Sequence, residues 1–259
     1  MPKLISMLLF LRIAIINISG NTGKTTVAMH GVDNALPDAE IICVESLNEI
    51  PKIDGQNLTT LKAEEADKLF EKMLISRNRE NLIADIGSSV VEQLLARMVE
   101  YDEVHEEFDL ILIPVTPENK QQIDTIKTVE LLINYGINPD KIRIVFNRAP
   151  KSQDYRDVFL PVIKYLEEKG YERMDVGAVI WETDFFDKLN RKGLSLNALL
   201  AEDYDAYDAI LDSPDPEISD EDRLSAAKRM KDIQRARRLK THIDEVFGRI
   251  LEGVYAYHL

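Results

Sequence analysis

The stretch IAIINISGNTGKTT, residues 13–26, constrains the fold of this chain more than any other. It opens with four consecutive apolar residues, a pattern typical of a strand whose two faces are both buried. Two glycines, Gly20 and Gly23, follow in a turn whose backbone branched residues would resist. The residues after Gly23 can continue as a helix. The sequence therefore predicts a strand, a glycine-containing loop and a helix in direct succession.

Further apolar runs rich in Ile, Val and Leu alternate with segments of helical spacing. The predicted strands are 11–17, 40–45, 81–86, 109–115, 141–147 and 176–181, and the predicted helices are 24–34, 62–76, 89–101, 119–135, 153–169 and 184–200. Most of these strands are apolar throughout, and the connections are long enough for right-handed crossovers. We therefore expect an α/β fold with a doubly wound, mostly parallel sheet and helices on both faces. Ligands of such sheets bind at the carboxyl ends of the strands.

The loop within residues 13–26 contains the residue types that phosphate binding requires. Lys24 can reach the β- and γ-phosphates of a nucleotide, and the Thr25 hydroxyl can bind Mg²⁺. Backbone N–H groups can cradle phosphate oxygens at the start of the predicted helix. The predicted nucleotide-binding residues here are Gly20, Asn21, Thr22, Gly23, Lys24, Thr25 and Thr26. Ile18 replaces the first glycine of the general pattern G-x-x-x-x-G-K-[ST], so the alternative is a strand-turn-helix that carries Gly-Lys-Thr by chance.

This loop, NISGNTGKTT, resembles that of the ParA/MinD family of P-loop ATPases, which commonly reads NQKGGVGKTT. It is most similar to the S-G-N-x-G-K-T-T loop of StbB-type plasmid-stability proteins. The resemblance covers about residues 11–200 and includes NLIADIGSS, DLILIPVTPE, IRIVFNR and VGAVIWETDFFDKLNRKGLSL. It implies ATP and Mg²⁺ as cofactors, Lys24 and Asp85 as catalytic residues, Thr25 and Asp85 at the metal, and Asn147 as the residue that recognises adenine.

Asp85 and Asn147 each have a structural alternative. Asp85 could end a strand or cap the next helix, and Asn147 could be a turn residue. Each follows an apolar strand, in order behind the loop, which favours the functional interpretation. Pro150 stands three residues after Asn147, where guanine-binding relatives usually have Asp, so adenine is favoured.

Two departures from the family pattern concern catalysis. Ser19 replaces the family's defining lysine, which reaches the phosphates of the partner subunit, and Leu47 replaces the second Asp of a D-x-D motif, with Glu45 at the first position. Loss of a transition-state cation can lower a phosphoryl-transfer rate by about 10³ to 10⁵. We therefore expect slow hydrolysis. Arg148 and Lys120 could supply a cation by position, although each could equally be a surface charge.

The residues after position 200 have a different composition. Residues 202–222 hold ten acidic residues and no Lys or Arg, whereas 223–240 hold eight Lys or Arg and one acid. We expect a P-loop nucleotide-binding domain over residues 1–200, and an acidic linker followed by a basic helical C-terminal extension over residues 201–259. A helix over about 219–252, capped by Ser219, would place four basic residues on one face and apolar ones opposite. The basic face consists of Lys228, Lys231, Arg235 and Arg238, opposite Ala226, Met230 and Ile233.

That basic face, within residues 223–240, has three interpretations. It could be a solvated surface, a nonspecific DNA-binding helix, or a site that docks an acidic partner or the chain's own acidic run. If it binds DNA, deletion of residues 219–259 should abolish DNA binding and leave ATP binding intact.

Composition restricts the remaining choices. A net charge of −14 argues against a protein that coats nucleic acid over its whole surface. The single cysteine, Cys43, lies in an apolar run and fits a reducing, cytoplasmic setting. Arg12 interrupts the apolar N-terminal stretch, so we expect a core strand there, with an extended start before Met7, and no membrane span.

Three functions follow from these features. The first is a cytoplasmic, Mg²⁺-dependent ATPase in which ATP controls homodimerisation; the StbB resemblance implies plasmid stability or partition, and conjugative transfer, with a plasmid DNA-binding partner protein. The second is a nucleotide-dependent switch or scaffold with little hydrolysis, which Ser19 and Leu47 favour. The third is an ATP-dependent small-molecule ligase on the same fold, for which no second set of polar groups stands out.

Overall fold

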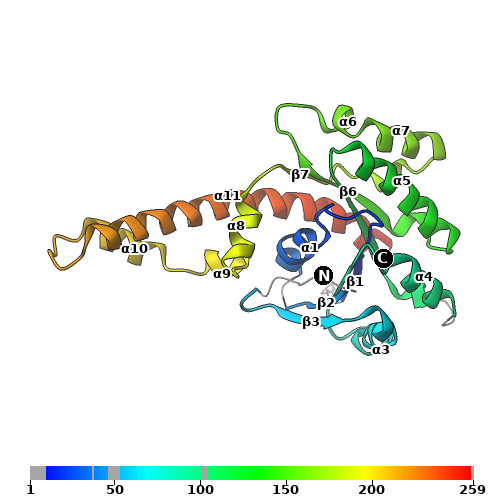
Figure 1. The fold of residues 1–259 in the computed structure, drawn as a ribbon, viewed down its shortest axis with the longest axis horizontal. Helices are drawn as coiled ribbons and strands as arrows, with labels where there is room; N and C mark the ends of the chain where they lie inside the picture. The colour runs from blue at the N-terminus through cyan, green and yellow to red at the C-terminus, as the bar shows by residue number, and fades with distance from the viewer. Residues whose placement is uncertain (1–9, 37, 46–52, 101–103, 258–259) are drawn as a thin grey trace, which may run out of the picture.

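The computed structural model describes residues 10–36, 38–45, 53–100 and 104–257. Within these residues a seven-stranded sheet forms the centre of the molecule, with the order β3-β2-β4-β1-β5-β6-β7 (Figure 1). Every neighbouring pair is parallel. The strands are β1 Arg12–Ile15, β2 Glu40–Val44, β3 Asn57–Leu61, β4 Leu82–Ile86, β5 Leu110–Val115, β6 Ile142–Ala149 and β7 Val179–Trp181. The predicted doubly wound α/β fold is confirmed.

Helices cover both faces of this sheet, and each face has its own apolar cluster. One face is covered by α3 (Ala66–Ser76), α4 (Val91–Glu100), α5 (Asn119–Asn134) and α7 (Leu160–Lys169). On the other face lie α1 (Lys24–Thr26), its π-helical continuation η1 (Val27–Val32), α2 (Asp33–Ala35), α8 (Phe185–Arg191) and the C-terminal half of α11 (Asp220–Tyr257). Adjacent strand residues alternate between the two clusters, as buried parallel strands require.

The remaining short elements connect the strands and helices of these layers or, for two of them, lie against α11. They are α6 (Tyr155–Val158), α9 (Leu196–Leu200), α10 (Tyr204–Asp212) and the 3₁₀ turns η2 (Ala63–Glu65), η3 (Val104–Glu107), η4 (Pro139–Lys141) and η5 (Glu172–Met174). Two predicted helices are each broken in two. Pro161, in the first turn of α7, has no backbone N–H to donate to Asp157 of α6, and the helix is interrupted at Phe159. Gly193, at φ +63°, separates α8 from α9.

One strand and one helix were not predicted from the sequence. β3 is an edge strand, and its sequence NLTTL has one buried residue, so it lacks the apolar run of the central strands. α10 lies in the acidic segment 202–222. It begins at Asp203, whose side chain accepts hydrogen bonds from the N–H groups of Asp205 and Ala206 at 3.1 Å.

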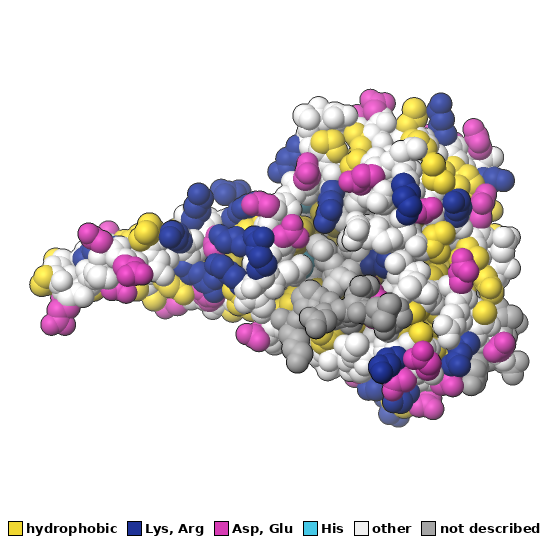
Figure 2. Space-filling model, in the orientation of Figure 1, with side chains coloured by type: hydrophobic (Ala, Val, Ile, Leu, Met, Phe, Trp, Pro, Cys, Tyr) yellow, Lys and Arg dark blue, Asp and Glu magenta, His cyan; other side chains and the backbone are white. Residues whose placement is uncertain are grey.

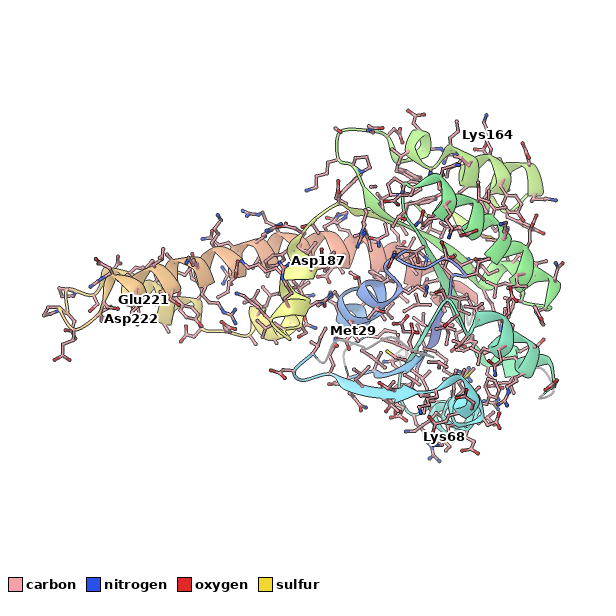
Figure 3. All side chains as sticks on the ribbon, viewed as in Figure 1. Met29, Lys68, Lys164, Asp187, Glu221 and Asp222 are labelled. Atoms are coloured by element: carbon pink, nitrogen blue, oxygen red, sulfur yellow. The ribbon has the colours of Figure 1, made fainter. Side chains whose placement is uncertain are left out.

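The C-terminal helix α11 has two parts with different surroundings. Its first part pairs with α10 in an arm that projects from the body, and Glu221 and Asp222 lie towards the outer end of that arm (Figures 1 and 3). Ser219 caps the helix as predicted, because its Oγ accepts from Asp222 N at 3.1 Å. Ala226, Met230 and Ile233, on the face predicted to lie opposite the basic residues, are buried.

The second part of α11 belongs to the main core. Ile243, Val246, Phe247 and Ile250 are at most 1% exposed and pack with the helix that follows β1. The ring of Phe247 lies where a Cβ atom at Gly31 would be. Deletion of residues 219–259 would therefore also remove core side chains that pack on η1 and α2. The separation of DNA binding from ATP binding by this deletion stays a prediction. None of the helices in the described ranges is long and apolar enough to span a membrane.

Candidate functional site

The loop between β1 and α1 lies at the carboxyl end of the sheet. Ile15, the last residue of β1, is in register with Asp85 of β4, so the chain leaving β1 passes beside that carboxylate. Gly23 takes a φ of +85° at the start of α1. A Cβ atom at Gly23 would overlap the side-chain amide of Asn147. Glycine is therefore required at this position by both backbone angle and space.

The side chain of Lys24 is folded into the loop. Its Nζ donates to the carbonyl oxygens of Asn17 at 3.1 Å and Ser19 at 3.0 Å. Burial lowers the pKa of Lys24, while the charges of Asp85 and Glu45 act in the opposite direction. The ammonium group is thus held at the centre of the loop, where a bound phosphate would supply the counter-charge.

Thr25 and Asp85 form the second polar pair of the site. The Thr25 hydroxyl donates to Asp85 Oδ2 at 2.7 Å, and Cys43 Sγ lies 3.9 Å from the same oxygen. Asp85 is only 4% exposed. Burial raises its pKa to about 6, against the lowering effects of the Thr25 hydrogen bond and the Lys24 charge. A carboxylate with such a raised pKa is poised to gain a cationic partner.

This donor set fits Mg²⁺. Hydroxyl and carboxylate oxygens are the ligands that Mg²⁺ prefers, and the ion usually takes one or two protein carboxylates together with substrate phosphates and water. No cluster of three or more His, Cys, Asp or Glu that could hold a metal occurs in the described part of the chain. Thr25 and Asp85 would hold the ion beside a nucleotide phosphate.

A polar network that the sequence did not predict attaches the loop to α5. Asn17, fully buried, donates to Pro114 O at 2.9 Å and to Thr125 Oγ1 at 2.8 Å, and it accepts from Thr128 Oγ1 at 3.2 Å. The N–H of Ile18 donates to the same Thr128 hydroxyl. The only signal in the sequence was a pair of threonines at helical spacing within residues 119–135.

Ser19 belongs to the same attachment. It is 1% exposed, and its Oγ donates to Asp124 Oδ2 at 3.1 Å. The side chain at this position therefore points into its own subunit, towards α5.

Glu45 faces the site from the end of β2. Its carboxylate lies against Gly87, where a Cβ atom would overlap it, and its charge acts on Lys24 and Asp85. Gly87 therefore leaves the space that the Glu45 carboxylate occupies. Leu47, the other residue of the expected acidic motif, lies outside the described residues.

Asn147 contacts the loop itself. Its Nδ2 donates to Thr22 O at 2.9 Å, and its Oδ1 accepts from the N–H of Arg148, whose φ is +54°. The hollow between α1, Asn147 and Trp181 has a volume of about 10 Å³, too small for a purine ring. Adenine recognition by Asn147 would require these side chains to move and stays a prediction.

A larger groove of about 780 Å³ lies beside this hollow and shares Trp181 and Thr183 with it. The indole of Trp181 stacks on the His242 ring at 5.9 Å. The groove is also lined by Lys151, Arg235 and Arg238. Figure 2 shows Lys and Arg side chains gathered where the arm joins the body, with acidic side chains towards the arm's outer end.

Comparison with known proteins identifies the fold. No protein-family model matches the chain, and no match was found among curated proteins. The structure of the MinD cell division protein of Aquifex aeolicus is 18% identical with a TM-score of 0.50, over 88% of this chain and 96% of that chain. The MinC:MinD complex of that organism gives 17% identity and 0.50, over 88% and 95%. An ATP complex of McdA from Cyanothece gives 12% and 0.48, over 86% and 96%.

The likeness to MinD shows that this chain shares the fold of that protein, a doubly wound α/β fold with a parallel sheet. The structure brings Lys24, Thr25 and Asp85 together at the carboxyl end of the sheet, as predicted, and places Asn147 against the loop.

Proposed function

We propose that this protein is a Mg²⁺-dependent ATPase of the ParA/MinD type that works in the cytoplasm. The observation that carries this proposal is the pair formed by Thr25 and Asp85 at 2.7 Å beside Lys24, in a loop that leaves the central strand of the sheet. Lys24 would neutralise phosphate charge, Thr25 would hold Mg²⁺, and Asp85 would bind the metal or its water. Asn147 would recognise adenine once it leaves Thr22.

In this proposal the nucleotide controls association. ATP binding promotes a homodimer, which then contacts a plasmid DNA-binding partner protein, and the biological role is plasmid stability or partition of the StbB type. The MinD of Aquifex aeolicus has been solved with MinC, so a fold of this kind can carry a protein partner. In this proposal residues 1–200 form the nucleotide-binding domain, and residues 201–259 form the acidic and basic extension. The C-terminal half of α11, within that extension, packs into the core of the domain.

The basic part of α11 is proposed to contact DNA without sequence specificity. Lys228, Lys231 and Arg238 are exposed. Arg235 is engaged otherwise, because it pairs with Asp184 and lies 4.7 Å from the Phe185 ring centroid. Replacement of the three exposed residues by Gln should weaken DNA binding and reduce its salt dependence, since each lost phosphate contact lowers the slope by about one. Lys164→Gln on α7 serves as the control, and unchanged binding by the triple variant would refute this part.

Phosphate release tests the ATPase directly. Wild-type protein with Mg²⁺, ATP and DNA should release phosphate faster than Lys24→Ala, and the rate should fall when EDTA removes the metal. Equal rates for the two proteins would show that this loop does not hydrolyse ATP.

A nucleotide-dependent switch is the second candidate. The contact between Ser19 and Asp124 favours it, because residue 19 supplies no cation to the phosphates and transition-state charge must be stabilised by other groups. Nucleotide-dependent dimerisation in sedimentation experiments, without phosphate release above the Lys24→Ala variant, would identify a switch.

A further inference from the structure

A lysine of α5 is held at the outer side of the loop through a shared carboxylate. Lys120 Nζ donates to Asp124 Oδ2 at 3.1 Å, and the same oxygen accepts from Ser19 Oγ at 3.1 Å. The carbonyl oxygen of Ser19 in turn accepts from Lys24 Nζ at 3.0 Å. These contacts connect the two ammonium groups through one loop residue, with Lys24 inside the loop and Lys120 outside it.

The charges inside the site are unbalanced for a phosphate ligand. Lys24 is accompanied by the carboxylates of Asp85 and Glu45, both of which act on it electrostatically. A nucleotide triphosphate adds several negative charges, and stabilisation of a terminal phosphate requires positive groups aimed at it. The N-cap residue of α5 is Glu118, and the first turn after it contains no acidic residue, so the N–H groups of that turn also favour an anion here.

Lys120 is poorly explained by stability alone. A cation in the first turn of a helix opposes the helix dipole, and an exposed i,i+4 ion pair contributes little. The Lys120 side chain is 76% exposed, whereas that of Asp124 is 15% exposed. Without Lys120, the Asp124 carboxylate would still pair with Lys127 Nζ at 3.5 Å and accept the hydrogen bond from the Ser19 hydroxyl. Lys120 can therefore turn away without leaving the Asp124 carboxylate unpaired.

We propose that Lys120 is a phosphate-binding residue that moves from Asp124 to the terminal phosphate of the nucleotide in the same chain's loop. It then distinguishes a nucleoside triphosphate from a diphosphate, because the diphosphate lacks the group that Lys120 reaches. This inference rests on the proposed nucleotide site and adds to it a second cation supplied by α5.

The test compares two lysines that share one carboxylate. Lys120→Ala and Lys127→Ala each remove one partner of Asp124. Lys120 contacts Oδ2, the oxygen that also accepts from Ser19 of the loop, whereas Lys127 contacts Oδ1. Equilibrium binding of fluorescent ATPγS and ADP is measured with Mg²⁺ for both variants and the wild type, with urea unfolding as the check on folding. We expect Lys120→Ala to bind ATPγS about tenfold more weakly, as for loss of one charge-assisted hydrogen bond, with ADP affinity unchanged. Lys120→Arg should keep most of the wild-type preference for ATPγS over ADP. Lys127→Ala should bind both nucleotides with wild-type affinity.

Two results would overturn the inference. If the ratio of ATPγS affinity to ADP affinity is the same for Lys120→Ala and wild type, Lys120 does not contact the terminal phosphate. Equal losses in both lysine variants would show that the effect passes through Asp124 or the general charge. If wild-type protein binds neither nucleotide, the proposed function itself fails, and that result is distinct from the other two.

Discussion

Replacement of Asp85 by Asn should stabilise the protein in the absence of nucleotide and metal. Burial raises the pKa of Asp85 from 3.8 to about 6, so folding confines a carboxylate where its charge is unfavourable. A shift of one pKa unit corresponds to about 1.4 kcal/mol, so this shift lowers the free energy of unfolding by about 3 kcal/mol at neutral pH. Asn keeps an oxygen that can accept from Thr25 and carries no charge to bury.

The pH dependence follows from the sign of the shift. Between pH 4 and pH 6 the folded state binds more protons at Asp85 than the unfolded state, so wild-type stability falls as pH rises through this window. Urea unfolding in EDTA should show the two proteins equal below about pH 4, and Asp85→Asn more stable by about 3 kcal/mol above about pH 6. Asp124→Asn is the matched control.

Asp124 should respond in the opposite direction. Burial acts to raise its pKa, but the bonds and charges from Lys120, Ser19 and Lys127 together hold that pKa below its ordinary value. The ionised form therefore stabilises the fold at neutral pH, and Asp124→Asn should be less stable there than wild type. A gap between wild type and Asp85→Asn that does not change with pH, or that has the opposite sign, would refute the reasoning about the buried carboxylate.

Three further substitutions test the packing and the loop. Phe247→Ala should lower the free energy of unfolding by about 3 to 5 kcal/mol in urea titrations, because its ring fills the space beside Gly31. Leu224→Ala, at a side chain 54% exposed on the same helix, should change that free energy by less than about 0.5 kcal/mol. Similar losses in the two variants would contradict this packing. Gly23→Ala should abolish nucleotide binding in a fluorescence titration, because φ is +85° and Asn147 occupies the space; wild-type affinity would mean that the loop rearranges. Arg223→Ala should speed amide hydrogen exchange in α10, because its guanidinium group donates to the carbonyl oxygens of Ile210, Leu211 and Ser213; unchanged exchange would show that the arm does not depend on this contact.

The central strands could be predicted because burial on both faces leaves continuous apolar sequence. β2, with the sequence EIICV, is buried at every position. The loop after β1 could be predicted because Gly23, Lys24 and Thr25 are the residue types that a phosphate-binding loop requires. β3 escaped prediction for the converse reason, since an edge strand with exposed Asn57 and Thr60 has no such run. The placement of Asp85 beside Thr25 was implied by the resemblance of NLIADIGSS to the family's second acidic motif, and the structure joins the two side chains at 2.7 Å.

The attachment of the loop to α5 could not be predicted, because it consists of contacts between residues far apart in the chain. Asn17 and Thr125 are ordinary polar residues until β5 and α5 are placed beside β1. The same holds for Phe247, whose ring covers Gly31 only once α11 packs against the helix after the loop. Apolar spacing indicated that α11 has a buried face, but it gave no partner for that face.

The most direct test of a nucleotide site built from Lys24, Thr25 and Asp85 is a calorimetric titration of ATP with and without Mg²⁺. Wild-type protein should bind one ATP per chain, and Mg²⁺ should tighten binding because Thr25 and Asp85 supply oxygen ligands. Thr25→Val should lose the Mg²⁺-dependent gain while keeping metal-free binding through Lys24 and the backbone. If wild-type protein binds no ATP, or if Mg²⁺ tightens binding equally in both proteins, the assignment of this site is contradicted.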